Sequence, residues 1–307
     1  MSPLISVGLP VYNGERYLRH AVSSVLSQDF EDFELIISDN ASTDATHDIC
    51  AEYAAADKRV RYFRHASNIG PVPNFNHVFS LAKGQFFKWL SCDDECCPGM
   101  LRRCAEVMET APSRVALVYP QGEVIDEQGK PRGTMLEHVG TRGLRPHQRL
   151  SWTLFKHGSA IALCGLIRSS ALKRTRLRGS FVMDDCALLA ELAMLGEIWE
   201  MPDVLLRIRI HPGNALTSCD GTPSLMAWLD PENKRKVFFL PPRPRFALEM
   251  FRSVSYLPMR PLDKLLCYAV ILPSYCGRPV RNMCGRQKRR FLQLWELDRF
   301  ERTRYTK

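Results

Sequence analysis

Acidic side chains at three places in this chain could carry chemistry, and the first is the adjacent pair Asp93 and Asp94. The pair follows the apolar run at residues 86–90 and lies on a polar turn. Two carboxylates at a strand end can hold a divalent cation through hard oxygen ligands. Such a cation can neutralise a diphosphate and stabilise it as a leaving group. The alternative is that Asp94 or Glu95 caps the helix that Pro98 opens.

The second place is Asp39, which follows the apolar strand expected at residues 33–37. A carboxylate there can accept a hydrogen bond from the imide N–H of uracil or from a ribose hydroxyl. Its alternative role is to cap the helix expected at residues 43–56. Because Asn40, Ser42 or Asp44 could cap that helix equally well, Asp39 is predicted to be left for a ligand.

The elements that must position these side chains alternate between strands and helices. This alternation indicates βαβ units and a mostly parallel sheet, in which ligands bind outside the carboxyl ends of the strands. Residues 10–13, 38–40 and 93–94 are therefore predicted to converge at one edge. Strands are expected at residues 4–10, 33–37, 60–63, 86–90 and 115–119, and helices at residues 16–28, 43–56, 74–82 and 98–108.

The second half of the chain is less regular. It predicts a polar hairpin at residues 123–133, a helix at 145–157 and a strand at 161–167. An amphipathic helix is expected at residues 183–196, followed by a strand at 204–210. Beyond residue 215, proline-rich joints separate short helices. The predicted organisation is a catalytic α/β domain at residues 1–215 and a mainly helical C-terminal extension at residues 216–307.

Four motifs together resemble family 2 glycosyltransferases. They are ISVGLPVYN at residues 5–13, IISDNASTD at 36–44, NIG at 68–70 and KGQF at 83–86, in the family's order and at its spacing. The resemblance covers roughly residues 4–120. It implies a GT-A fold, a Rossmann-like sheet flanked by helices. It also implies a nucleotide-diphospho-sugar donor, Mn²⁺ or Mg²⁺, and transfer of the sugar to an acceptor hydroxyl with inversion.

The resemblance also implies roles for residues in the first half. Pro10, Tyr12 and Asp39 would line the nucleoside pocket, and Glu15 would help on the ribose side. Asp93 would be the preferred metal ligand and Asp94 the second. The family's D-x-D motif is incomplete here, because Ser91 replaces the first acid. The same donor site would include Asn13, Asn68, Gly70 and Ser91.

The segment MDDCALLAEL at residues 183–192 resembles the place of the family's catalytic base. Asp185 aligns as the base and Asp184 as its neighbour, and the helix dipole would help to keep either carboxylate ionised. The alternative is that one of them only caps the helix. His211 follows a basic strand and is a further candidate metal ligand. Arg207 and Arg209 are predicted to share one face of that strand.

Composition limits the classes of partner. The 307 residues carry a net charge of +9, and residues 278–307 are rich in Arg and Lys. This basic stretch favours peripheral membrane contact, with a solvated helix face as the alternative. The first residues lack a secretory pattern, and the spacing of the eleven cysteines is not that of a disulfide framework. We therefore expect a cytoplasmic protein, peripheral on the inner face of the cell membrane.

The same residues also bear on three other classes of function. A sugar nucleotidyltransferase would need a glycine-rich basic loop after the first strand, and residues 10–14 are not such a loop. A nucleic-acid binder would need an aromatic platform or a known module beside the basic stretch. A sugar-nucleotide-binding pseudoenzyme is the alternative that Ser91 supports. The preferred prediction is a glycosyltransferase that acts on a glycan or lipid-linked acceptor in bacterial-type polysaccharide or glycolipid assembly, with no nucleic-acid partner.

Overall fold

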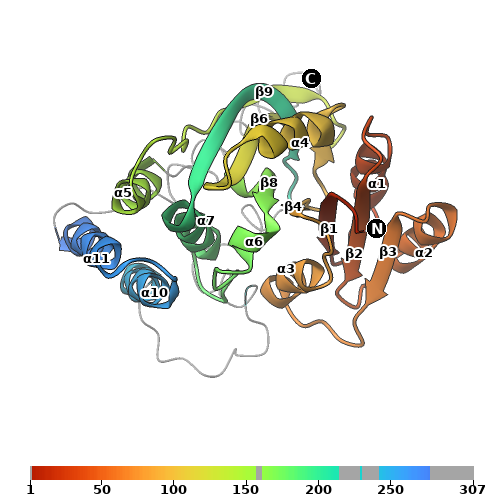
Figure 1. The fold of residues 1–307 in the computed structure, drawn as a ribbon. Coiled ribbons are helices and arrows are strands. Elements are labelled where there is room, and N and C mark those ends of the chain that lie inside the picture. The colour runs from red at the N-terminus through yellow and green to blue at the C-terminus, as the bar shows by residue number, and fades with distance from the viewer. Residues whose placement is uncertain (1, 157–160, 214–228, 230–241, 277–307) are drawn as a thin grey trace, which may run out of the picture.

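A nine-stranded mixed sheet forms the centre of the molecule (Figure 1). The computed structural model describes residues 2–156, 161–213, 229 and 242–276. The strands follow the order β3-β2-β1-β4-β8-β6-β9-β5, and β7 pairs with β6 outside that path. Helices cover both faces, so the predicted α/β class with a Rossmann-like sheet is confirmed.

The four strands at the N-terminal side are parallel, as the sequence predicts. They are β1 (Ile5–Val11), β2 (Phe33–Asp39), β3 (Val60–Arg64) and β4 (Phe86–Trp89). Alternate residues of β1, including Val7 and Leu9, pack in the same buried cluster as helices α1 (Leu18–Leu26), α2 (Thr46–Ala56) and α4 (Met100–Thr110). This burial on one side of the pleat places the three helices on the same face of the sheet.

The opposite face of the sheet is covered by helices α3 (Pro71–Ser80), α6 (Ser169–Leu172) and α7 (Asp184–Leu195). Ile36 and Phe87 of the sheet join Leu188 of α7 in the second buried cluster. Side chains of β2 thus enter both clusters. Ile36 belongs to the second cluster, whereas Leu35 and Ile37 belong to the first, together with residues of α1 and α2. The sheet is a buried middle layer, as expected for βαβ units.

The strands of the second half are longer and more irregular than predicted. β6 (Val115–Ile125) and β9 (Glu197–Arg209) pair in parallel, and β7 (Pro131–Met135) completes the predicted hairpin with β6. The strand predicted at residues 161–167 is wrong in its first half, where a 3-10 turn (Ile161–Cys164) precedes β8 (Leu166–Arg168). The two-residue strand β5 (Glu95–Cys96) pairs with β9 and was not predicted.

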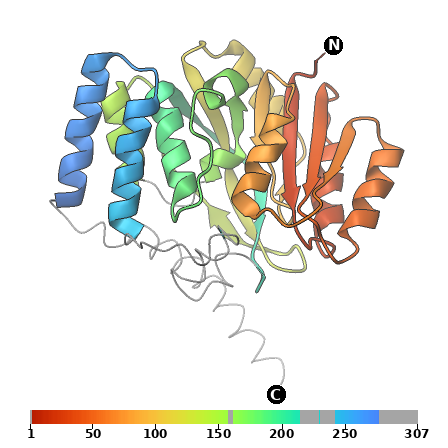
Figure 2. The ribbon, with the colours of Figure 1, turned by 90° about the horizontal axis from the view of Figure 1, so that it is seen from below.

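Helices α5 (Pro146–Lys156), α10 (Pro242–Tyr256) and α11 (Pro261–Cys276) pack beside α7, and Figure 2 shows α10 and α11 standing next to it. Met250 of α10 and Ile271 of α11 share a buried cluster with Leu150 and Ala190. Helix α7 is therefore buried nearly all round, and the prediction that it is amphipathic was wrong. The helices that the structure describes are too short or too polar for a bilayer crossing.

Candidate active site

The loops that follow β1 and β2 are joined by hydrogen bonds at the carboxyl edge of the sheet. The backbone N–H of Asn13 donates to Oγ of Ser42 (2.9 Å), and the N–H of Thr43 donates to Oδ1 of Asn13 (2.9 Å). Asn13 adopts a left-handed backbone with φ of 49°, a conformation that asparagine tolerates well. The side chain of Asn13 thus positions the second loop, and two of the predicted clusters do meet here.

Glu15 lies in the same network. Its Oε2 accepts a hydrogen bond from the N–H of Ala45 (2.9 Å), and its own N–H donates to Oδ2 of Asp44 (3.1 Å). Glu15 thus contacts the N-terminus of α2 in this structure, and its role on the ribose side stays a prediction. Tyr12, in contrast, is 48% exposed beside this network, so its ring is available to a base.

Asp39 is fully buried at the end of β2, and its carboxylate already has partners. Oδ1 accepts from the N–H of Ser42 (2.8 Å), and Oδ2 accepts from the hydroxyl of Tyr62 (2.9 Å). The guanidinium of Arg64 lies 3.3 Å from Oδ2. The sequence predicted a carboxylate left for a ligand, whereas the structure holds it between protein donors. Oδ1 keeps a second lone pair, which a ligand donor could still use.

Asn40 is a buried residue of the predicted cluster at residues 38–40 for which the sequence predicted no ligand contact. Its side-chain amide donates to Oδ1 of Asn68 (2.9 Å) and to the carbonyl of Gly70 (3.1 Å), and its Oδ1 accepts from the N–H of Ile69 (2.8 Å). Gly70 has a φ of 86°, which favours glycine. Asn40 therefore shapes the loop that carries the predicted donor residues Asn68 and Gly70. The polar residue directly after a strand was the signal for it.

A polar cluster lies behind this loop, around the buried Ser38. Its hydroxyl donates to Oδ1 of Asn74 (2.6 Å), and it lies 3.0 Å from Nδ1 of His77 and 3.2 Å from Nε2 of His65. The two imidazole rings have centroids 4.6 Å apart. Burial lowers the pKa of His77, and the neighbouring His65 lowers it further. The cluster connects β2 to α3 directly beneath Asp39.

The structure separates the two members of the acidic pair. Oδ2 of Asp93 lies 3.0 Å from Nε2 of His211, so two predicted metal ligands are in contact. Asp94 is buried instead, and its Oδ1 accepts from the backbone N–H of Arg209 (3.0 Å). Burial raises the pKa of Asp94 well above its usual range, and the charge of Asp93 adds to the effect. In this structure one oxygen of Asp94 is thus engaged by the backbone of β9, and its role as the second metal ligand stays a prediction.

The capping alternative for this turn was wrong, because α4 begins after Gly99 without a side-chain cap. Ser91 closes the turn with its backbone carbonyl, which accepts from the N–H of Asp94 (3.3 Å). Pro10 lies inside β1 and is buried. Its place in the nucleoside pocket stays a prediction.

Arg209 ties the acidic turn to β9. Its guanidinium donates to the carbonyls of Asp93 and Asp126, each at 3.0 Å, and forms an ion pair with Glu95. Arg207 also reaches Glu95, with its guanidinium 3.7 Å from the carboxylate. The prediction that the two arginines share one face is confirmed. Their acidic neighbours occupy that face, so the arginines act here as structural partners of the turn.

Asp93 and His211 supply one carboxylate oxygen and one imidazole nitrogen at adjacent positions, which fits a divalent cation that takes its other ligands from phosphate and water. Within the described ranges, three or more His, Cys, Asp or Glu side chains do not gather as a metal group. The residues present therefore fit a cation held jointly with a ligand.

The second acidic pair lies at the start of α7, and its two members also differ. The guanidinium of Arg178 donates twice to Asp184, from Nε to Oδ2 (2.7 Å) and from Nη2 to Oδ1 (3.1 Å). Burial raises the pKa of Asp184, although Arg178 opposes this effect. Asp185 is half-buried, and its Oδ1 accepts from the N–H of Cys186 (2.8 Å). Asp185 is thus the more exposed member of the pair, whereas both oxygens of Asp184 are held by Arg178.

Cys164 ends the 3-10 turn before β8, and its carbonyl accepts a hydrogen bond from the buried Lys88. Burial raises the pKa of its thiol to about 12, although Lys88 opposes this effect.

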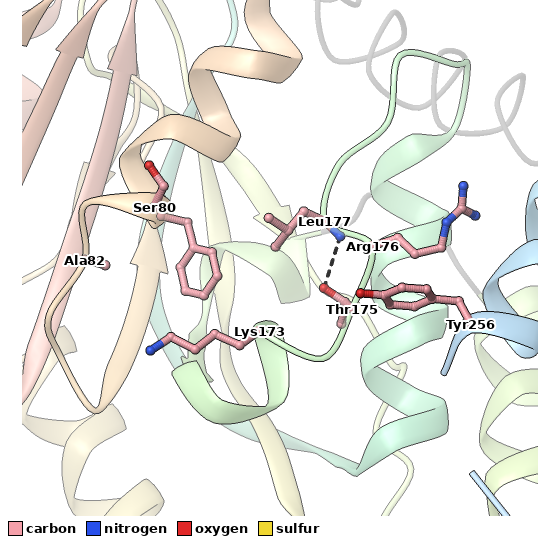
Figure 3. A pocket seen from close by; sticks show the side chains of 8 residues that line it. Ser80, Ala82, Lys173, Thr175, Arg176, Leu177 and Tyr256 are labelled. Atoms are coloured by element: carbon pink, nitrogen blue, oxygen red, sulfur yellow. Dashed lines mark hydrogen bonds between the residues drawn. The ribbon is translucent and has the colours of Figure 1, made fainter. Parts of the chain in front are cut away.

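A separate cavity of about 620 Å³ opens elsewhere, between α3, the segment after α6 and α10 (Figure 3). Ser80, Lys173, Leu177 and Tyr256 are among its lining residues. Ser80 ends α3, whereas the donor loop enters α3 at its start. The cavity is thus distinct from the predicted donor site.

Comparisons with known proteins place the chain in a family. Residues 6–175 match the family described as Glycosyl transferase family 2. An uncharacterized glycosyltransferase of Rickettsia felis is 30% identical over 172 residues, which are 55% of this chain and 26% of that protein. A GalNAc(5)-diNAcBac-PP-undecaprenol beta-1,3-glucosyltransferase of Campylobacter jejuni is 31% identical over 150 residues, which are 48% of this chain and 46% of that protein. The chain thus spans only about a quarter of the length of the Rickettsia relative.

Two solved structures share the fold. S. aureus TarS in complex with UDP-GlcNAc superimposes with a TM-score of 0.54 at 17% identity, covering 91% of this chain and 93% of that one. The mannosyltransferase PcManGT from Pyrobaculum calidifontis, in complex with GDP-Man and Mn²⁺, has a TM-score of 0.54 at 15% identity, covering 96% and 86%. Because the family match covers more than half of the residues and the sheet has the predicted GT-A architecture, the chain belongs to glycosyl transferase family 2.

Proposed function

We propose that this protein transfers a sugar from a nucleotide-diphospho-sugar to an acceptor hydroxyl, with inversion at the anomeric carbon. The observation that carries the proposal is the contact between Asp93 and His211 at 3.0 Å. Asp93 lies on the turn after β4. This strand pairs directly with β1, which leads into the predicted nucleoside loop. The alternative of a pseudoenzyme rested on Ser91, and the paired Asp93 and His211 oppose it.

The donor would lie across the carboxyl edge of the sheet. The exposed ring of Tyr12 and the buried Asp39 would flank the base, and Asn40 would hold the loop at residues 68–70 around it. The solved relatives that share the fold bind UDP-GlcNAc or GDP-Man, which supports this class of donor. Asp93 and His211 would hold Mn²⁺ or Mg²⁺, which when bound supplies positive charge that stabilises the departing diphosphate.

Asp185 would act as the general base. The acceptor oxygen forms a bond to C1 of the sugar, and its proton passes to the Asp185 carboxylate. The bond between C1 and the diphosphate oxygen breaks, and its electron pair leaves with the nucleoside diphosphate. Asp184 is unsuited to this step, because Arg178 holds both of its oxygens. Its ion pair would instead fix the start of α7 and so position Asp185.

The acceptor would be lipid-linked and the protein peripheral on the inner face of the cell membrane, in bacterial-type polysaccharide or glycolipid assembly. The name of the Campylobacter relative includes an undecaprenol-linked acceptor. On α11, Leu262, Leu265 and Leu272 are 66%, 64% and 56% exposed. Their spacing of three and seven residues places them on one helix face, which we call the α11 stripe.

The sequence after α11 suits the same partner. Residues 278–307 lie outside the described residues and contain ten Lys or Arg and three acidic residues. An apolar stripe that leads into a basic stretch fits a surface of anionic lipids, because the stripe can enter the acyl boundary while the cations attract the headgroups. The proposed occupant of the α11 stripe is therefore an anionic bilayer.

A donor screen tests the proposal. UDP-, GDP- and dTDP-sugars are added to the full chain with and without Mn²⁺, and the melting temperature is measured. A ligand that binds the native state alone raises that temperature. One sugar class is expected to do so only with Mn²⁺, and the same class is expected to release its nucleoside diphosphate when an undecaprenol-linked glycan is added. A flat response to all three classes would contradict the proposed function.

A further inference from the structure

Tyr17, the residue at which α1 begins, carries a polar group without a role in the fold. The residue is 7% exposed, so its side chain is more than nine-tenths buried. Its hydroxyl oxygen is also buried and has no hydrogen-bond partner in the described part of the chain. Leaving such a group unpaired costs free energy, and native proteins keep few of them. Phenylalanine would fill the same space without that cost.

The ring of Tyr17 lies against the proposed metal pair. Its centroid is 4.8 Å from that of His211, with the rings tilted by 51°. His211 is therefore held between the ring of Tyr17 and the carboxylate of Asp93, since its Nε2 lies 3.0 Å from Oδ2 of Asp93. A neighbour that packs on a ligating imidazole sets the direction of its nitrogen, and such neighbours matter for metal affinity.

Cations surround the same ring. The guanidinium carbons of Arg209 and Arg16 lie 4.8 Å and 5.0 Å from its centroid. Arg209 is anchored by Asp93 and Glu95 of the acidic turn and by the carbonyl of Asp126 after β6, whereas Arg16 is 61% exposed and pairs with Glu127 at 2.5 Å. An O–H donor beside two guanidinium groups and an imidazole suits an anionic oxygen.

We propose that Tyr17 is a further binding residue of the donor site. Its hydroxyl donates a hydrogen bond to an oxygen of the bound diphosphate, and its ring keeps the imidazole of His211 directed at Asp93. This inference rests on the proposed function. It assigns to one side chain both a ligand contact and a positioning role, and the two can be separated by substitution.

Two variants of the full chain separate these roles. Tyr17→Phe removes only the hydroxyl, and Tyr17→Leu also removes the ring that packs on His211. Tyr53→Phe is the matched control, because the hydroxyl of Tyr53 lies 2.8 Å from Oγ of Ser23 on the surface between α1 and α2. For each protein, the melting temperature is measured without ligand, and the affinities for UDP, GDP and dTDP are measured by calorimetry with and without Mn²⁺.

The expected effects of Tyr17→Phe have opposite signs. Removing a buried unpaired hydroxyl should raise the melting temperature of the ligand-free protein by about 2 to 4 °C. Losing one hydrogen bond to a charged oxygen should weaken Mn²⁺-dependent nucleotide binding about tenfold. Tyr17→Leu should weaken it further, by about 10 to 100-fold, as loss of a residue that orients a metal ligand does. Tyr53→Phe should leave the affinity unchanged.

The outcomes distinguish a failure of the role proposed for Tyr17 from a failure of the proposed function. If the unsubstituted protein binds a nucleotide and Tyr17→Phe binds it as tightly, the inference is overturned and the proposed function stands. A lower melting temperature for Tyr17→Phe also overturns it, because the hydroxyl then has a structural partner. If the unsubstituted protein binds none of the three nucleotides with Mn²⁺, the proposed function and the inference fall together.

Discussion

The carboxylate of Asp93 and the imidazole of His211 lie 3.0 Å apart, although 118 positions separate them in the chain. One belongs to the turn after β4 and the other follows the end of β9. The fold brings them together because β5, directly after the acidic turn, pairs with the last part of β9. A short strand thus joins the two halves of the proposed metal site.

Asp93→Asn and His211→Gln are each expected to lose most of the Mn²⁺ dependence of nucleotide binding. Each substitution removes one of two adjacent metal donors, and a loss of at least about tenfold in Mn²⁺-dependent affinity should follow. Calorimetry of UDP binding with and without Mn²⁺ measures it. Asp203→Asn, an acid-to-amide change elsewhere on β9, serves as the control. Equal Mn²⁺ stimulation in all four proteins would remove the pair from the metal site.

The two acids of α7 should give opposite phenotypes. Asp185→Asn should keep donor binding and lower the transfer rate by about 10² to 10⁴-fold, the usual contribution of a general base. Asp184→Ala leaves the buried Arg178 without its partner and should destabilise the protein by about 3 to 5 kcal/mol. Product release and urea unfolding measure the two effects. Full transfer activity in Asp185→Asn would place the base elsewhere.

The Ser38 cluster should make stability depend on pH. Burial and the neighbouring His65 lower the pKa of His77, so the native state keeps this imidazole neutral. As the pH falls below about 6.5, the ordinary value for histidine, the unfolded chain takes up the proton first and stability is lost. The melting temperature should fall from pH 8 to pH 5, and less steeply in His77→Gln. His20→Gln, at an exposed position, is the control; identical slopes in all three proteins would exclude His77.

The α11 stripe should bind anionic membranes. Changing Leu262, Leu265 and Leu272 together to serine removes apolar area that is already exposed, so folding should be preserved. Co-sedimentation with vesicles of phosphatidylcholine and phosphatidylglycerol should fall by at least about tenfold, since one half-buried leucine contributes on the order of 1 kcal/mol. Leu136→Ser directly after β7, where the leucine is 44% exposed, is the control. Unchanged sedimentation of the triple variant would rule out this surface.

The first half of the fold could be predicted because its signals are local. The apolar runs of β1, β2 and β4 are bounded by polar turns, so strand and edge were both visible in the sequence. β6 and β9 extend well beyond the apolar residues at their starts, because the backbone of each strand is hydrogen-bonded to the other. A two-residue strand such as β5 leaves no periodic signal, and only its pairing with β9 defines it.

The site was predictable as a set of residues and only in part as a geometry. Asp93 and His211 were both candidates, but their contact depends on long-range pairing. The burial of Asp94 could not be predicted, because its partner is the backbone of Arg209, 115 positions away. Asp185 was preferred over Asp184, and the ion pair of Asp184 with Arg178 supplies a physical reason for that order. Tyr17 lies within the helix expected at residues 16–28, and that expectation gave no sign of its unpaired hydroxyl.

The path from Asp185 to His211 is one continuous unit, with α7 running into β9 through Gly196. A side chain at Gly196 would lie 2.6 Å from the carbonyl oxygen of Arg114, so this connection has no room for any residue but glycine. An inserted or deleted residue in β9 would shift one end of the unit against the other. The proposed base and metal ligand must therefore be inherited together. We expect differences in acceptor choice to arise from segments outside this unit. Such segments can change length without altering the distance between Asp185 and His211.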